Sequence, residues 1–459
     1  MDGTAPPPRT LAIIGGGFSG ACLALHLARA NFPGRIVIFE PRPVLGRGVA
    51  YSTRDDAHRI NARASRMSLY PDDPGHFTRW LAETGACDDD PEATLPDGRR
   101  FPRRAVYGAY VTAQVAPLLA AGRVWHVRAE MSELVARGGG WQLNGADGAV
   151  HQADIAVLAT GHPPPRIPPP LAGIAGHQAF IANPLQSGAL DGIAPDAKIL
   201  IIGTGLTMAD TVASLDRAGH TGAITAISRR GQWPRPHAME DKHGAADFAP
   251  PASACVLLRQ VRAAVKKAEA EGLTWQGVFD VLRWRAEEFW RALPVPERRR
   301  LLRHARPFWD THRHRLPPPT AAILARRLAE NTLRIAAAAV TGVHGADRRI
   351  DVFFRRRGAG AAARETFDAV ILTAGPGRLD EPENALSAKL LSSGLLTLDA
   401  TGQGFCCGAA GQVEGRQGPP LFVVGPPTRG TFAEIISVPE IARQIDALTA
   451  AAFAEAPRS

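Results

Sequence analysis

A glycine-rich turn between an apolar strand and a helix constrains the fold of this chain more than any other feature. The apolar run 11–14 predicts a short buried strand, the letters GGGFSG follow it, and a helix-forming segment comes next. Gly15, Gly17 and Gly20 fit the spacing GxGxxG, in which the glycines allow a tight turn, a close approach of backbone to a pyrophosphate, and close helix–strand packing. The N-terminus of the helix then faces the phosphates. This segment predicts the first half of a Rossmann-like dinucleotide-binding fold.

An acidic residue closes this first unit. The β-branched run 35–39 predicts a second strand, and Glu40 follows it at about the 20-residue spacing from the glycines at which such folds place a ribose-binding carboxylate. A carboxylate there accepts hydrogen bonds from a ribose diol and repels a 2′-phosphate, which suits FAD or NAD. We expect FAD, because flavoproteins of this architecture usually carry it first. The expected FAD contacts are Gly15, Gly17, Phe18, Ser19, Gly20, Glu40, Arg47, Thr160 and Gly161, with Arg429, Thr431 and Phe432 before the last predicted helix.

A second strand–turn–helix–strand unit lies near the middle of the chain. Gly203 and Gly205 keep the two phosphate-facing glycines, whereas Met208 replaces the third glycine and is expected to hold the helix farther from the strand. The second strand ends in Ser-Arg-Arg at 228–230, without a carboxylate. Arginine with serine suits a 2′-phosphate, which favours NADPH over NADH, and a solvated arginine pair is the alternative. The expected contacts are Gly203, Thr204, Gly205, Leu206, Thr207, Ser228, Arg229 and Arg230.

The length of the chain suits two or three domains. We expect an α/β protein with two Rossmann-like domains and a helical insert: an FAD domain at 1–170 and 376–459, an inserted NAD(P) domain at 190–240 and 333–375, and helices at 245–332. Two short segments, 125–129 and 141–143, predict a small antiparallel sheet. No apolar run approaches the roughly 20 residues that span a bilayer, and the first residues lack a signal-peptide core. We therefore expect a cytoplasmic protein without membrane contact.

The cysteines and histidines predict neither a disulfide framework nor a metal site. The five cysteines form no CxxC pair. His312 and His314 are next-nearest neighbours in the sequence, without a supporting cluster of carboxylates.

The densest basic run, 283–315, has two interpretations. Its arginines, with Trp284, Trp290 and Trp309 interleaved, could form a nucleic-acid surface with stacking platforms, in a chain whose net charge is +9. The other interpretation is an amphipathic helical lid with buried tryptophans and with arginines facing water. Acidic residues interrupt the run, which favours the lid and makes nucleic acid the less favoured partner.

Longer segments resemble a known family. They are GGGFSG (15–20), GRGVAYST (46–53), HRINARASRMS (58–68), FPRRAVYGAY (101–110), VLATGHPP (157–164), GTGLTMADTVASL (203–215), SRRG (228–231), WDTHRHR (309–315) and GPPTRGTFAEIISVPEIARQ (425–444). In these the chain resembles bacterial FAD/NAD(P)-binding proteins related to class B flavin monooxygenases, including aspartate N-monooxygenases. The stretch 180–190 lacks the histidine of the Baeyer–Villiger fingerprint, which argues against ketone-to-ester chemistry.

The resemblance implies FAD in the outer domain, NAD(P)H in the inserted domain, and hydride transfer to the flavin. In monooxygenase relatives the reduced flavin traps molecular oxygen as a C4a-(hydro)peroxyflavin that oxygenates a small nucleophilic substrate. An amine nitrogen is the favoured target here. One alternative is a non-oxygenating NAD(P)H–flavin reductase or dehydrogenase. The other is a nucleic-acid-binding or nucleotide-sensing flavoprotein that uses the basic run.

Three residues between the glycine turns are candidates for catalysis. Asn61 could hydrogen-bond the flavin ring, or it could only form an Asx-turn. His58 could carry protons near neutral pH, or it could be a structural histidine. Arg104, like Arg47, could bind a carboxylate or the pyrophosphate through paired hydrogen bonds.

Overall fold

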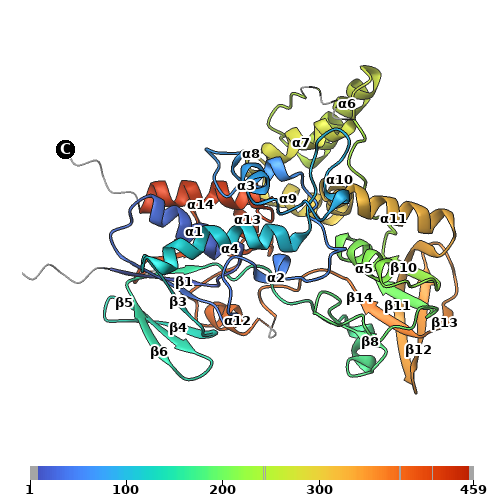
Figure 1. Cartoon of the computed structure of the whole chain (residues 1–459), viewed down its shortest axis with the longest axis horizontal. Coiled ribbons are helices and arrows are strands. Elements are labelled where there is room, and N and C mark those ends of the chain that lie inside the picture. The colour runs from blue at the N-terminus through green and yellow to red at the C-terminus, as the bar shows by residue number, and fades with distance from the viewer. Residues whose placement is uncertain are drawn as a thin grey trace, which may run out of the picture.

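The computed structural model describes residues 9–240, 242, 244, 246–381, 384–415 and 417–453. Figure 1 shows a sheet domain built from both ends of the chain, a second sheet domain built from its middle, and a group of helices above their junction. No helix among the described residues combines the length and the apolar character that crossing a bilayer requires.

The first sheet is parallel and has the strand order β15-β7-β1-β2-β3. Its strands are β1 (Thr10–Ile14), β2 (Arg35–Phe39), β3 (Val124–Val127), β7 (Ile155–Leu158) and β15 (Leu421–Val423). Side chains alternate along β1, so Leu11 and Ile13 enter one core while Ala12 and Ile14 enter the core on the opposite face. The sheet is therefore buried on both sides, as continuous apolar strands require.

Helices cover one face of this sheet and a small antiparallel sheet covers the other. The helices are α1 (Phe18–Arg29), α4 (Arg104–Ala120) and α14 (Val438–Ala452), and the small sheet has β4 (Met131–Arg137), β5 (Gly140–Gly145) and β6 (Val150–Ala153). Shorter helices complete the domain: α2 (Gly48–Tyr51), α3 (His76–Thr84), α12 (Ala385–Ser392) and α13 (Arg429–Phe432). The expected pairing of 125–129 with 141–143 is wrong, because Trp125 lies in β3 of the parallel sheet, opposite Val37 of β2.

The second sheet has the order β13-β12-β11-β10-β9-β14-β8. Its parallel strands are β8 (Phe180–Ile181), β9 (Ile199–Ile202), β10 (Ile224–Ser228), β11 (Leu333–Ala346) and β14 (Ala369–Leu372), and the antiparallel strands β12 (Arg349–Arg356) and β13 (Ala363–Phe367) extend one edge. Two parallel sheets with crossover helices confirm the α/β class with two Rossmann-like domains. The sheet includes β8, which precedes the expected boundary at residue 190.

Two helices cover one face of the second sheet. α5 (Leu206–Arg217) follows the second glycine turn, and α11 (Pro318–Ala329) packs beside it. Leu215 and Leu324, one from each helix, lie in a single core with the strands. α11 therefore belongs to this domain in space, although it falls within the expected helical insert.

The helical insert comprises α6 (Ala254–Ala270), α7 (Trp275–Trp284), α8 (Ala286–Ala292), α9 (Val295–His304) and α10 (Arg306–Arg313). It has a small core of its own, in which Val278, Leu282 and Phe289 meet. Figure 1 shows these helices above the two sheet domains, with α8 close to α13.

The expectation that the arginines of 283–315 face water is wrong for three of them. Arg283, Arg313 and Arg315 are only 8%, 8% and 6% exposed. Arg283 pairs with Glu440 of α14, and the Arg313 Nε lies 3.3 Å from a carboxylate oxygen of Glu434. Arg283 and Arg313 therefore fasten the insert to the first domain, whereas Arg315 donates to Asp280 of α7 within the insert. The segment does not present one continuous basic surface.

The tryptophans of the same segment differ in exposure. Trp290 is buried, as expected, and its indole Nε1 donates to the carbonyl oxygen of Gly430 at 2.7 Å. The Nε1 of Trp309 donates to Glu434 at 2.7 Å. Trp284, in contrast, is 49% exposed. Two of the three tryptophans thus dock the insert against the segment that precedes α14.

Candidate cofactor cleft

The first glycine turn has the backbone geometry of a phosphate cradle. Gly15 has a φ of +105°, and a Cβ on it would lie 2.5 Å from the carbonyl oxygen of Ala159. A Cβ on Gly20 would lie 1.9 Å from the carbonyl oxygen of Gly15. α1 begins at Phe18, and no side chain caps it at Gly17. Its first N–H groups therefore lack partners within the helix and suit an anion such as a pyrophosphate.

Glu40 stands at the end of β2 and is held in place by backbone amides. It is 6% exposed and accepts hydrogen bonds from the N–H of Gly16 at 2.9 Å and of Arg42 at 3.1 Å. A Cβ on Gly16 would lie 2.6 Å from the Cβ of Glu40, so this position needs glycine as well. The GxGxxG pattern leaves Gly16 unspecified, which is why the sequence did not single it out.

The other expected FAD contacts surround the same turn. The N–H of Gly46 donates to the carbonyl oxygen of Gly16 at 2.8 Å, which lays the loop bearing Arg47 over the glycines. The Nε of Arg47 is buried and has no hydrogen-bond partner. Thr160 and Gly161 follow β7, which pairs directly with β1. A Cβ on Gly161 would meet no atom within 4 Å, so the backbone here borders open space.

The second glycine turn repeats this geometry. Gly203 has a φ of +119°, and a Cβ on it would lie 2.3 Å from the carbonyl oxygen of Thr373. α5 begins at Leu206 and is uncapped at Gly205, so its first amides, including that of Thr207, are also free to bind an anion. Met208, which stands in place of the third glycine of the motif, is fully buried in the core of this domain.

The residues that end β10 have different surroundings. Ser228 Oγ accepts from Thr204 Oγ1 at 2.8 Å and from the N–H of Gly231 at 3.0 Å, so its hydroxyl is part of the turn. Arg230 donates to the carbonyl oxygens of His304 at 3.0 Å and Arg303 at 3.1 Å. Arg229 is exposed, and among the described residues no hydrogen bond or ion pair of its guanidinium is found. Arg229 is thus the arginine left available for a phosphate.

His58 and Arg104, two of the candidate catalytic residues, lie between the two sheet domains. The Nδ1 of His58 is 2.9 Å from Thr53 Oγ1, and its Nε2 is 3.1 Å from Ser214 Oγ of α5. Burial lowers the pKa of His58, which keeps the ring neutral at neutral pH. Arg104 donates to Asp210 of α5 at 2.7 Å. Both side chains therefore position α5 against the first domain.

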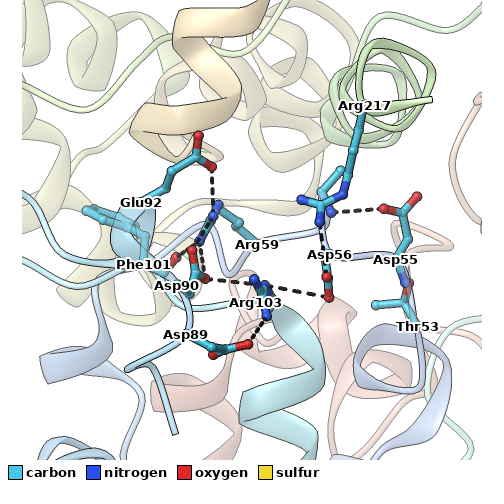
Figure 2. A network of polar contacts seen from close by, with 11 residues as sticks. Thr53, Asp55, Asp56, Arg59, Asp89, Asp90, Glu92, Phe101, Arg103 and Arg217 are labelled. Atoms are coloured by element: carbon cyan, nitrogen blue, oxygen red, sulfur yellow. Dashed lines mark hydrogen bonds and ion pairs between the residues drawn. The ribbon is translucent and has the colours of Figure 1, made fainter. Parts of the chain in front are cut away.

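Figure 2 shows the polar network around this contact. Arg217 reaches from α5 to Asp56 at 3.2 Å. In the same network, Arg59 is 3% exposed and donates to both carboxylate oxygens of Asp90 at 2.8 Å. Two parallel hydrogen bonds of this kind fix the orientation of the guanidinium relative to the carboxylate, as well as the distance between them. The network holds the loop that leads to Asn61.

Asn61 is fixed through its backbone. His237, from the second domain, places its Nε2 2.9 Å from the carbonyl oxygen of Asn61. Burial lowers the pKa of His237 to about 4, so the ring is neutral and its Nε2–H can donate. The structure therefore places Asn61, His58 and Arg104 along one domain boundary, an arrangement that no sequence motif indicates.

The turn between α13 and α14 is strained. Ala433 has a φ of +56° and a ψ of −69°, and the N–H of Glu434 donates to the carbonyl oxygen of Phe432 at 2.6 Å, as in a γ-turn. Thr431 Oγ1 donates to the carbonyl oxygen of Cys407 at 3.0 Å. Backbone strain of this kind concentrates at functional sites. No sequence signal marks Ala433, because alanine is an ordinary helix residue.

Replacing Ala433 by glycine is expected to stabilise the protein by about 1 kcal/mol, because glycine adopts a positive φ without the steric strain of a Cβ. The midpoint of thermal unfolding should rise. An Ala409→Gly change in the neighbouring loop, where the alanine lacks a positive φ, serves as the control and should not raise it. An unchanged or lower midpoint for Ala433→Gly would show that the turn is unstrained.

Arg429 lies where the two ends of the first domain meet the insert. Burial lowers the pKa of His162, the residue after Gly161, to about 4, and the positive charges of Arg429 and Arg306 lower it in the same direction. This coupling shows that the end of β7, α10 and α13 converge. No cluster of metal-ligating side chains is found among the described residues, and their five cysteines are free.

Comparisons with known proteins agree with this geometry. Residues 12–163 match the family model described as FAD-NAD(P)-binding. No curated protein matches the sequence. L-lysine 6-monooxygenase from Pseudomonas syringae is similar in structure, with a TM-score of 0.69 at 18% identity over 96% of this chain and 98% of that chain.

Ornithine hydroxylase from Pseudomonas aeruginosa has a TM-score of 0.66 at 16% identity, over 97% of this chain and 99% of its own. Thioredoxin reductase from Lactococcus lactis has a TM-score of 0.52 at 13% identity, over 96% of both chains. Identities this low compare folds and not reactions. Residues 12–163 thus match an FAD-NAD(P)-binding family, and the fold of the whole chain is close to that of the ornithine and lysine monooxygenases.

Proposed function

We propose that this chain is an NAD(P)H-dependent flavin monooxygenase that oxygenates an amine nitrogen of a small molecule. The observation that carries the proposal is the pair of glycine turns, each leading into a helix with an uncapped N-terminus, in two domains joined by buried polar contacts. Such a pair suits two dinucleotides, one donating electrons and one receiving them. The shared fold with ornithine hydroxylase and lysine 6-monooxygenase supports the choice of an amine.

In this proposal FAD, when bound, supplies the redox chemistry with molecular oxygen, and the protein supplies binding and orientation. The free amides at the start of α1 hold its pyrophosphate, and Glu40 accepts from its ribose. Asn61, whose backbone carbonyl is held by His237, would offer its side-chain amide as a hydrogen-bonding group for the flavin. His58 and Arg104 act as positioning residues, because they hold α5 and its dinucleotide against the first domain.

The proposed reaction is tested with purified, FAD-loaded protein and a panel of primary amines. We expect NADPH to reduce the flavin without oxygen, and isotopically labelled oxygen gas to appear in a hydroxylamine product. NADPH oxidation that yields only hydrogen peroxide with every amine, together with rapid reduction of an added acceptor, would favour a reductase. That outcome is the second candidate, because a thioredoxin reductase shares the fold. A flavin that neither NADPH nor NADH reduces would overturn both.

We further propose that NADPH is the electron donor and that Arg229 binds its 2′-phosphate. Arg229→Ala is expected to raise the KM for NADPH by about tenfold or more, because a charge-assisted hydrogen bond to phosphate contributes about 1.5–3 kcal/mol. The KM for NADH should stay within about twofold.

Arg230→Ala is the matched control, because Arg230 already binds the carbonyls of Arg303 and His304. It should affect NADPH and NADH equally. Equal effects of Arg229→Ala on the two donors would show that this arginine does not contact a 2′-phosphate, and NADH would then be the better candidate.

A further inference from the structure

An apolar chamber lies inside the helical insert, outside the two glycine turns. Its volume is about 450 Å³, within the range of roughly 300–1,000 Å³ that small-molecule pockets occupy. Its walls come from α6, α7, α8, α9 and α10, and include Leu257, Val261, Phe279, Phe289, Leu293 and Trp309. Leu258 and Phe308, which also line it, are 38% and 48% exposed and form an apolar rim open to solvent.

Part of the chamber wall is polar and includes residues of the strained turn. Arg429, Ala433 and Glu434 line it there, together with Arg306 and Asp310. The chamber is therefore lined both by the helices of the insert and by the turn between α13 and α14. A molecule in it would have an apolar body among the helices and a polar group at this turn.

Most charged groups in this polar part of the wall already have partners. Glu434 accepts from the indole of Trp309 at 2.7 Å and lies 3.3 Å from the Nε of Arg313. Arg306 lies 3.5 Å from Asp310 and donates to the amide oxygen of Gln403 at 2.5 Å. Each of these side chains has a partner within the protein, although one carboxylate oxygen of Asp310 and one of Glu434 make no hydrogen bond.

Arg429 differs from its neighbours. Among the described residues its guanidinium makes no hydrogen bond or ion pair, although burial and the nearby charge of Arg306 lower the pKa of Arg429. Arginine stays protonated in proteins and binds carboxylates through paired hydrogen bonds. A buried charge without a partner is unfavourable, so this polar part of the wall suits an anionic group of a ligand.

We propose that the chamber binds the substrate, and that the substrate is an α-amino acid with an apolar side chain whose carboxylate pairs with Arg429. This inference rests on the proposed function, which supplies the amine. An α-amino acid already carries a carboxylate and an α-ammonium group. The apolar walls disfavour a further charge such as the terminal ammonium of ornithine or lysine, because Leu257, Val261 and Phe289 cannot pair with it. The specificity of this chain therefore differs from that of the enzymes whose fold it shares.

Binding is measured by titration calorimetry on the oxidised, FAD-loaded protein without NADPH, so that no turnover is needed. The probes are norvaline, norleucine, ornithine and pentylamine. Norleucine should bind about fourfold more tightly than norvaline, because it buries one more methylene. Ornithine, which is norvaline with a terminal ammonium, should bind at least about tenfold more weakly. Pentylamine, which is norleucine without its carboxylate, should bind about tenfold or more weakly than norleucine.

Two variants separate the parts of the site. Arg429→Gln should remove the preference for norleucine over pentylamine. It should keep the increase in affinity that one more methylene gives, from norvaline to norleucine. Leu301→Gln, in the chamber wall, should reduce the gain per methylene and keep the carboxylate preference. Arg300→Gln is the control, because Arg300 is 61% exposed, pairs with Glu297 and does not line the chamber. It should change neither quantity.

Several results would overturn the inference. Ornithine binding as tightly as norvaline would show that the chamber does not select the substrate. An Arg429→Gln protein that loses FAD but keeps its carboxylate preference would assign Arg429 to the cofactor. A failure of the proposed reaction has a different signature: norleucine then binds as expected, but no oxygenated product forms from it with NADPH and oxygen.

Discussion

Replacing Gly17 by valine is expected to give a folded protein that carries no FAD. Gly17 precedes α1, where the free amides face the expected pyrophosphate, and a side chain there occupies the path by which backbone and phosphate approach. A Cβ on Gly17 would lie 3.3 Å from the Cα of Gly48, a contact that a small shift relieves. Gly15 and Gly20 are poorer choices, because a Cβ on either overlaps backbone carbonyl oxygens and threatens folding itself.

The measurement is the flavin absorbance per mole of purified protein, read beside the far-ultraviolet circular dichroism. Gly176→Val is the matched control, because Gly176 is exposed and a Cβ there would meet no atom within 4 Å. The control should be as yellow as the parent protein. Full FAD content in a folded Gly17→Val protein would place the flavin elsewhere and contradict the assignment of the first site.

The two dinucleotide units could be predicted from the sequence because their physics is local. A tight turn with a positive φ at Gly15 and Gly203 requires glycine, and apolar runs on either side specify buried parallel strands. The spacing of Glu40 after the glycines follows from the length of one helix and one strand. Each of these constraints acts within a few tens of residues and can therefore be recognised in the amino-acid sequence.

The candidate catalytic residues could not be interpreted in the same way. His58 and Arg104 have partners on α5, at Ser214 and Asp210, more than a hundred positions away. A histidine in a polar loop looks the same in the sequence whether it carries protons or joins two domains. The strand around Trp125 was misassigned for a related reason, since a short alternating segment does not specify which strand it pairs with.

The basic run shows how composition misleads when partners are distant. Arginines interleaved with tryptophans suggest an exposed, nucleic-acid-binding surface, because charged residues are seldom buried without a partner. Here the partners exist, but they lie on α14 and in the turn before it, at the other end of the chain. The apolar chamber is invisible for the same reason, because its walls come from five helices whose packing no single segment specifies.

Replacing Glu440 by glutamine is expected to loosen the helical insert from the first domain. Glu440 is 6% exposed and Arg283 is 8% exposed, and the second contact of their paired geometry is 2.9 Å. Removing one partner of a buried ion pair leaves the other charge unpaired, which costs about 3–5 kcal/mol. Hydrogen exchange should rise in α7 and α8, and limited proteolysis should cut the insert at lower protease concentrations than in the parent protein.

The pH dependence provides an independent check on this pair. Burial raises the pKa of Glu440, but Arg283, Arg313 and a backbone hydrogen bond together oppose it more strongly, so the pKa is lowered overall. A carboxyl whose pKa is lower in the folded state contributes stability above its unfolded value of about 4.3, and loses it as the pH falls through the folded pKa. The parent protein should therefore release its insert in acid, whereas Glu440→Gln should show a smaller change over the same range.

A double variant distinguishes loss of the pair from loss of packing. Arg283→Met combined with Glu440→Met removes both charges and fills similar volume, which is often neutral for a buried pair. It should restore much of the protection lost in Glu440→Gln and abolish the acid dependence. Protection that stays as low as in Glu440→Gln would mean that the salt bridge itself holds the insert. Normal protection in Glu440→Gln would mean that Trp290 and Trp309 hold the insert without it.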